Sequence, residues 1–413
     1  MKFTDPEVYF PSFFLTEEIR MIQKTVHDFV DKEIMPVRHL LDDDKSRELT
    51  NKIRQHMCDI GLQRLPFPKK YGGEGFRSKV GDCIISEELS RGDVGLSMFY
   101  SCNRWGWRPA ITANNEAVLS EFMPDFCGNE LKICCYNMTE PGGRHGGGGA
   151  DIENPFYEGR KIRTIAKLEG SEWVINGSKL WASSAGDADL QCVVCTVDPD
   201  LGLDGVVLIY VPYPWKGLSL GKNENKTGLS TDANCATYFD DVRVPKEWGI
   251  GPGGIAAKIF TAQPVTPGLS AMAAGQIRGA FETILDYTGE RIAGDKILRQ
   301  HATTAVVLAN MAIALEAARA LYLTSAYISD NLENMGPANQ AFFPTRANIA
   351  KVFGPEIAVK VIGDAIPLMG SYGCAHEYNL EKYWRDSKVL TLVLGGVLVN
   401  RLNVCRGYYD LDL

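Results

Sequence analysis

The chain has 413 residues, of which 45% are hydrophobic and 23% charged, and its 43 basic and 51 acidic side chains give a formal net charge of -8. This length can bury a large core without disulfides or a structural metal, and the composition is that of an ordinary globular protein. The acidic balance and the lack of a long Lys/Arg run exclude nucleic acid as an expected partner.

Two features of the sequence predict a protein that neither spans nor enters a membrane. Residues 1–14 carry acidic and aromatic side chains where a signal peptide would need a basic and then an apolar stretch. The longest aliphatic run, Val389–Val399, is too short to cross a bilayer. We therefore expect a cytoplasmic protein.

The eleven cysteines do not predict a disulfide framework or a metal site. Cys192 and Cys195 have the spacing of a metal-binding pair, but they lie inside a strand-like apolar run. We interpret them as small buried hydrophobic residues, with free thiols in a reducing compartment.

The chain reads as helical, then β-rich, then helical. From Thr16, a predicted N-cap, to about Leu131 the apolar residues follow a helical period. Short runs rich in β-branched residues alternate with Gly, Asp and Asn turns from Ile133 to Val244, and the helical period returns after Pro252. The segregation of helices from strands predicts an α+β fold with three domains, 1–132 helical, 133–248 a β-sheet or barrel, and 249–413 a helical bundle.

Five segments in this order resemble the acyl-CoA dehydrogenase family. They are Cys135–Gly143, Asn176–Ser183, Thr227–Pro245, Ala309–Arg319 and Glu377–Asp386. The first two are similar to the flavin-binding segments of that family. The resemblance implies the fold of that family, with a C-terminal four-helix bundle, and FAD as the cofactor.

The residues that would hold the flavin are transferred from these segments. Backbone and hydroxyl groups can donate hydrogen bonds to the polar edge of the ring, and an indole can stack on it. The cofactor residues implied by the resemblance are Tyr136, Met138, Thr139, Trp181, Ser183, Gly370 and Ser371, with Arg291 reaching the pyrophosphate in a neighbouring subunit. A homotetramer and electron-transferring flavoprotein as redox partner follow from the same resemblance.

The catalytic carboxylate of the family is missing. Family members use a Glu to remove the α-proton of an acyl thioester, and counting from Arg385-Asp386 places Leu394 at that position. The alternative location used by some relatives is Gly268 here. The base is therefore unassigned, with Tyr100, His376 and Asp151 as candidates.

Substrate contacts are expected from the helix that starts near Gly92 and from the loop after the first flavin segment. The resemblance points to Met98, Tyr100, Arg104 and Ala150. An aromatic lining with a guanidinium suits a cyclic or aryl acyl group, with Arg104 available to a second carboxylate. A bulky core helix with an exposed Arg104 explains the same pattern equally well.

The sequence predicts an FAD-dependent oxidoreductase acting on an acyl-CoA thioester with a non-standard base. Three alternatives remain open because Leu394 cannot accept a proton. They are a base-independent elimination or lyase reaction, a flavin monooxygenase, and a non-catalytic partner subunit in a hetero-oligomer.

Overall fold

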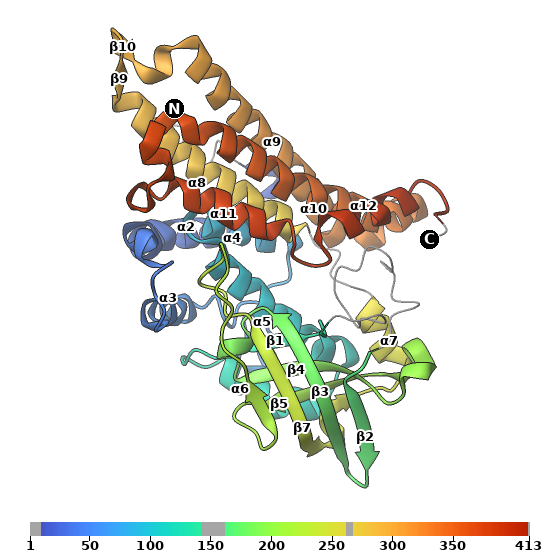
Figure 1. Ribbon diagram of the computed structural model, residues 1–413. Helices are drawn as coiled ribbons and strands as arrows, with labels where there is room; N and C mark the ends of the chain where they lie inside the picture. The colour runs from blue at the N-terminus through green and yellow to red at the C-terminus, as the bar shows by residue number, and fades with distance from the viewer. Residues whose placement is uncertain (1–9, 142–161, 262–266, 412–413) are drawn as a thin grey trace.

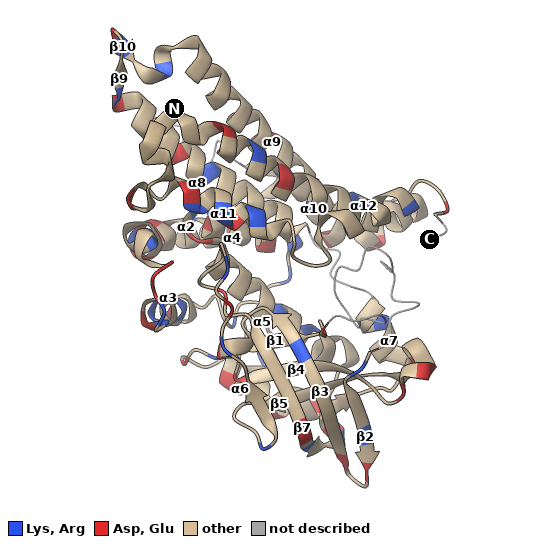
Figure 2. Cartoon of the chain, in the orientation of Figure 1, with Lys and Arg blue, Asp and Glu red and all other residues tan. Residues whose placement is uncertain are grey.

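The computed structural model describes residues 10–141, 162–261 and 267–411. A β-sheet lies at one end of the molecule and a bundle of long helices at the other, with N-terminal helices between them (Figure 1). The predicted α+β class is confirmed. Basic and acidic residues are interspersed along the helices and strands (Figure 2).

Four of the five N-terminal helices begin at a residue whose side chain caps the helix. The five are α2 Glu17–Phe29, α3 Glu48–Asp59, α4 Lys79–Gly92, α5 Val94–Ala113 and α6 Glu116–Phe126, of which α3 has no such cap. Thr16 Oγ1 accepts a hydrogen bond from the amide of Ile19 at the start of α2, as the sequence predicts. Asp93 caps α5 in the same way, since its carboxylate accepts from the amide of Leu96.

The middle of the chain forms one eight-stranded sheet in the order β6-β7-β3-β2-β4-β5-β8, with β1 paired in parallel to β4. The strands are β1 Cys134–Asn137, β2 Ile165–Glu169, β3 Glu172–Ala182, β4 Leu190–Thr196, β5 Val206–Pro212, β6 Leu218–Leu220, β7 Cys235–Pro245 and β8 Gly249–Ile250. Strand β4 is buried along its whole length, because it pairs with β1, β2 and β5. The pairing brings the first flavin segment, on β1, into the same sheet as the second, on β3.

Cys192 and Cys195 lie in the middle of β4, as expected. Their odd spacing puts them on opposite faces of the sheet, each within a different apolar cluster. Burial raises the pKa of both thiols. The described residues hold no group of three or more His, Cys, Asp or Glu side chains that could bind a metal.

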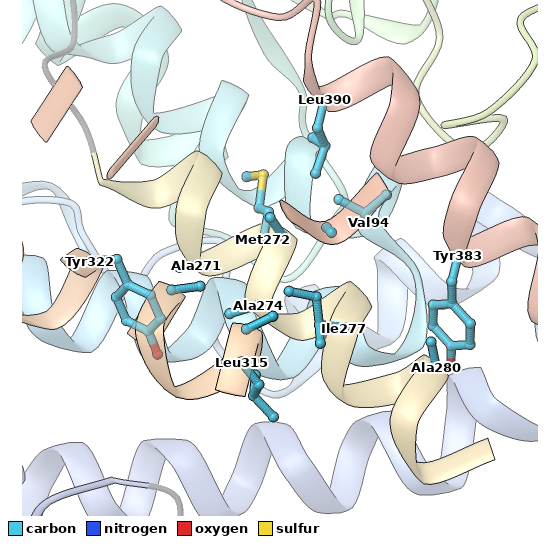
Figure 3. Close-up of a cluster of buried hydrophobic side chains, with 14 of the residues drawn as sticks. Val94, Ala271, Met272, Ala274, Ile277, Ala280, Leu315, Tyr322, Tyr383 and Leu390 are labelled. Carbon is cyan, nitrogen blue, oxygen red and sulfur yellow. The ribbon is translucent and has the colours of Figure 1, made fainter. Parts of the chain in front are cut away.

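The rest of the chain is mainly helical. Its elements are α7 Gly254–Thr261, α8 Gly268–Glu290, β9 Ile292–Ala293, β10 Lys296–Ile297, α9 Ala302–Asp330, α10 Pro337–Ala365, α11 Leu380–Leu390 and α12 Gly396–Arg406, with short 3-10 segments Ile366–Cys374 and His376–Tyr378 before α11. Helix α8 is buried on most of its surface because α4, α9, α10 and α11 pack around it. Figure 3 shows part of this core, where side chains of α8 meet Leu315 and Tyr322 of α9 and Tyr383 and Leu390 of α11.

Small residues let α8 approach α4 closely. A Cβ atom at Gly275 would overlap the carbonyl of Glu87, and one at Gly279 would overlap the carbonyl of Arg91. Helix α9 is the one described helix that is long and apolar enough to cross a membrane by length and composition. It packs against α8 and α10 within the bundle, and a core helix passes the same test, so this property alone assigns no membrane span.

Candidate functional site

A cavity of about 890 Å³ lies between the sheet, helix α5 and the C-terminal helices. It brings together residues from both flavin-like segments and the position of the missing carboxylate. The predicted site residues on its wall are Tyr136, Met138, Thr139, Trp181, Ser183 and Leu394. Segments more than 200 residues apart in sequence therefore share one site.

The sheet side of the cavity is tied together by hydrogen bonds between the two segments. The amide of Leu180 donates to the carbonyl of Thr139 at 2.8 Å, and Lys179 Nζ donates to the carbonyl of Met138 at 3.2 Å. Lys179 is fully buried and also forms an ion pair of 2.7 Å with Glu140. This buried pair fixes the end of β1 against β3.

The end of β3 and the turn after it present Trp181 and Ser183 to the cavity. Trp181 is 52% exposed although it lines the cavity, so about half of its surface is available to a ligand. Asn234 Nδ2 donates to the carbonyl of Trp181 at 2.9 Å, and the amide of Ser184 donates to Asp232 Oδ1 at 2.8 Å. The segment before β7 thus holds the turn in place.

Three of the eight described non-glycine residues with a positive φ lie on the cavity wall. Trp181, Leu229 and Leu394 have φ angles of 61°, 53° and 52°, in the left-handed region that non-glycine residues rarely adopt. Such residues cost of order 1–3 kcal/mol each and persist at functional sites where the surroundings enforce them. The geometry marks this cavity as the candidate site independently of any motif.

The helical side of the cavity carries Leu394 on the turn between α11 and α12. Gly395 and Gly396 follow it with φ angles of 84° and 64°, so three successive residues are left-handed. The carbonyl of Leu394 accepts hydrogen bonds from Lys351 Nζ on α10 and from Asn400 Nδ2 on α12, the latter at 3.1 Å. A leucine therefore occupies a turn that is firmly held.

Lys351 is a cavity residue that sequence reasoning missed. Its side chain is buried, and burial lowers the pKa of its ammonium group to about 7. Nothing in the local sequence identifies it, since it lies 43 positions from Leu394 on an ordinary helical stretch. Only the packing of α10 against the α11–α12 turn brings Lys351 to Leu394.

A second, smaller cavity of about 210 Å³ lies between α4, α5 and the start of α8. Trp105 and Arg108 of α5 line both cavities, so they stand at the boundary between them. Gly268, the alternative position for a carboxylate, lines the smaller one. Leu394 and Gly268, the two positions expected for a catalytic carboxylate, thus each line a cavity.

The structure places Tyr100 and Arg104 away from the large cavity. The Arg104 guanidinium is paired with both carboxylate oxygens of Asp82, and it also donates to the Tyr100 hydroxyl at 3.2 Å. Burial raises the pKa of Tyr100, which disfavours it as a base. The alternative of a bulky core helix agrees with the buried side chains of α5, but Arg104 is only 20% exposed and its bidentate face is already engaged by Asp82. Met98 is fully buried in the core.

Four other predicted residues do not face the large cavity of this subunit. The His376 side chain is 79% exposed and hydrogen-bonds Glu381 at 2.9 Å. Arg291 immediately precedes β9, at the end of the bundle that lies away from α12 (Figure 1), and Gly370 and Ser371 are exposed in the 3-10 segment after α10. Ala150 and Asp151 lie outside the described residues.

The cavity suits the flavin that the resemblance implies. Its volume lies in the range of cofactor pockets, and its wall is mostly apolar with a few polar groups. The Thr139 hydroxyl makes no hydrogen bond within the described residues, so it is available to a ligand. An uncovered indole face and open hydroxyl donors fit an aromatic ring with a polar edge.

Comparison with known proteins shows the family. Residues 16–130 match the family model for the N-terminal domain of acyl-CoA dehydrogenases, 135–242 the middle domain, and 265–408 the C-terminal domain. The chain belongs to the acyl-CoA dehydrogenase family, whose members are FAD-dependent oxidoreductases. The family resemblance read from the sequence is confirmed.

Curated relatives and solved structures cover nearly the whole chain. Cyclohexane-1-carbonyl-CoA dehydrogenase of Syntrophus aciditrophicus is 28% identical over 397 residues, 96% of this chain and 97% of its own length. The mitochondrial short-chain specific acyl-CoA dehydrogenase of Sus scrofa is 28% identical over 95% of this chain and 90% of its own. Butyryl-CoA dehydrogenase from Megasphaera elsdenii superposes with a TM-score of 0.82 at 25% identity, covering 95% of this chain and 98% of its own.

Proposed function

We propose that this protein is an FAD-dependent oxidoreductase that oxidises an acyl-CoA thioester, with a proton acceptor other than residue 394. One observation carries the proposal. Both flavin-like segments and the Leu394 turn line a single cavity whose wall contains three strained non-glycine residues. FAD would supply the acceptor for hydride from the β-carbon.

The residues of the chain have separate tasks in this proposal. Trp181 covers one face of the flavin ring, and the hydroxyls of Thr139 and Ser183 bind its polar edge. Backbone and side chains around Leu394 close the site from the helical side and exclude water from the reacting carbons. Leu394 itself takes no part in proton transfer.

The acyl group that fits best is cyclic. The named activity of the Syntrophus aciditrophicus relative is on cyclohexane-1-carbonyl-CoA. Trp105 lines both cavities, and its indole offers a flat apolar surface to a ring. Because Arg104 is paired with Asp82, it is not available to bind a second carboxylate on the substrate.

Assembly into a homotetramer accounts for the predicted cofactor residues outside the cavity. Arg291, Gly370 and Ser371 are exposed, so they are available to the flavin of a neighbouring subunit. Large apolar side chains are exposed on α9, among them Val306 at 59% and Ile313 at 66%, as at a subunit interface. Electron-transferring flavoprotein remains the expected electron acceptor, and the cytoplasm the expected location. A chain in the structure of the electron transferring flavoprotein of Acidaminococcus fermentans has the same fold, with a TM-score of 0.83.

Anaerobic titration of the purified protein tests the proposal. The flavin is first identified by its absorbance spectrum, and butyryl-CoA and cyclohexane-1-carbonyl-CoA are then added stepwise. We expect loss of the oxidised flavin band with the cyclic ester at about one equivalent. Turnover without bleaching would instead indicate elimination or a lyase step, oxygen consumption a monooxygenase, and no response to any ester a partner subunit.

A further inference from the structure

Within the part of the chain that the structure describes, Lys351 is a buried lysine without a carboxylate partner. The two other lysines that are buried as completely are both paired, Lys179 with Glu140 at 2.7 Å and Lys382 with Asp386 at 2.8 Å. Among the described residues, the hydrogen bond of Lys351 goes to the main-chain carbonyl of Leu394. A buried ammonium with only a neutral acceptor is unfavourable, so this amine is poised to lose its proton.

The Lys351 amine lies beside the position of the missing carboxylate. It lies on the wall of the large cavity, and it contacts the same residue that replaces the family's catalytic carboxylate. The base of an α-deprotonation must come within hydrogen-bond reach of the reacting carbon or reach it through one water. Lys351 is the buried lysine that meets the Leu394 turn from within the site.

We propose that Lys351 is the proton acceptor of this enzyme, taking the place of the missing glutamate. The inference rests on the proposed function, because it requires an acyl-CoA in the cavity. Its neutral Nζ accepts the α-proton as the Cα–H bond breaks, and the electron pair of that bond forms the Cα–Cβ double bond. The β-hydrogen leaves with its own electron pair as hydride to FAD. The ammonium then returns its proton to solvent.

Among the described residues, no charged side chain perturbs the pKa of the Lys351 amine. Burial alone accounts for the lowered pKa of Lys351, to about 7. The other described charged groups on the cavity wall are Lys226 and Asp232 beside the sheet, Arg108 on α5 and Arg406 on α12. Glu356 and Arg401 form an ion pair between α10 and α12. None of these groups shifts the pKa of Lys351. The amine can therefore be neutral at the working pH.

Four proteins test the inference: the native protein, Lys351→Arg, Lys351→Met and Lys360→Met, each purified with flavin bound. Arginine keeps a donor for the Leu394 carbonyl but cannot become neutral, so it separates proton transfer from simple anchoring of the turn. Lys360 is the matched control, because it is an exposed lysine on the same helix. Flavin content per subunit and circular dichroism establish that each variant is folded.

The measurement is the exchange of α-protons of cyclohexane-1-carbonyl-CoA and butyryl-CoA with solvent deuterium, followed by mass spectrometry from pH 6 to 9, alongside flavin reduction. We expect both rates in the native protein to fall below about pH 7, as the amine becomes charged. Lys351→Arg and Lys351→Met should lose at least about 100-fold. Lys360→Met should match the native protein.

The outcomes distinguish the two proposals. Native-like exchange in Lys351→Arg, or a native profile with no change around pH 7, would show that Lys351 only anchors the turn, and would leave the proposed function standing. Failure of every ester to exchange or to reduce the flavin of the native protein would overturn the proposed function, and Lys351 as base with it. The pKa of the amine is also measured without turnover, through the pH dependence of unfolding.

Discussion

The two walls of the cavity are each backed by a buried lysine, and the lysines differ. On the sheet side Lys179 is paired with Glu140 and holds the carbonyl of Met138. On the helical side, within the described residues, Lys351 hydrogen-bonds the carbonyl of Leu394 and pairs with no carboxylate. The first lysine has the geometry of a structural ion pair, whereas the second has the environment of a group that titrates near neutral pH.

This difference separates cofactor binding from proton transfer. The sheet side carries the residues predicted to bind flavin, in one hydrogen-bonded unit. The helical side carries a left-handed turn with Leu394 at the position predicted for the carboxylate. We infer that this chain differs from its family in the proton acceptor on the helical side, whereas flavin binding on the sheet side is retained.

The largest effect is expected on the sheet side. Lys179→Met leaves Glu140 buried and unpaired, so the free energy of unfolding should fall by about 3–5 kcal/mol, and the flavin should be lost with the displaced end of β1. Chemical denaturation followed by tryptophan fluorescence measures the change. In Lys179→Met/Glu140→Gln part of the loss should be recovered, and equal losses in both variants would contradict a structural ion pair.

Restoring the carboxylate is the next largest change. The backbone at Leu394 is already left-handed, so Leu394→Glu requires no new backbone conformation. In the Lys351→Met background, which lacks the proposed base, Leu394→Glu should raise the rate of flavin reduction by butyryl-CoA at least about 100-fold, the contribution of a positioned base. Stopped-flow absorbance measures it. Leu394→Gln has the same shape without a base, and a similar rise in that variant would refute the explanation.

Lys351→Met should alter the pH dependence of stability. The pKa of this amine is about 7 in the folded protein and about 10.4 when unfolded, so the unfolded state binds more protons between these values and native stability rises with pH there. From pH 6.5 to 8.5 the native protein should gain about 2 kcal/mol in unfolding free energy relative to Lys351→Met. The same comparison with Lys360→Met should be flat. Parallel curves for the native protein and Lys351→Met would mean that the amine stays charged when folded.

Trp181→Ala should weaken flavin binding without unfolding the sheet. The side chain is half exposed in the cavity, so its removal takes away ligand contact more than core packing. A lost stacking contact of about 1.5 kcal/mol corresponds to roughly tenfold weaker affinity. Flavin retained after gel filtration measures the loss. Trp215→Phe serves as control, since Trp215 packs against Trp248 outside the cavity wall, and equal flavin loss there would remove Trp181 from the cofactor site.

The fold could be predicted because its signals are local. Helical periodicity, the caps at Thr16 and Asp93, and the β-branched runs around β4 depend on neighbouring residues alone. The union of Thr139, Trp181 and Leu394 in one cavity could be expected only through the family resemblance. Periodicity by itself does not bring such distant segments together.

The remaining features depend on packing that no local pattern encodes. The pairing of Arg104 with Asp82 joins α5 to α4, and it occupies the guanidinium that the sequence predicted to contact the substrate. The contact of Lys351 with Leu394 joins α10 to the α11–α12 turn. Long-range contacts of this kind decide the ionisation state of a side chain, and so they decide which residues carry the chemistry.

The most direct test of the central claim is the rate of flavin bleaching by cyclohexane-1-carbonyl-CoA carrying hydrogen or deuterium at the α-carbon, mixed anaerobically with the native protein. Removal of the α-proton by Lys351 predicts bleaching that is slowed by the deuterium label and is at least about 100-fold slower in Lys351→Arg. Bleaching at equal rates with both labels, or none with either, would contradict it.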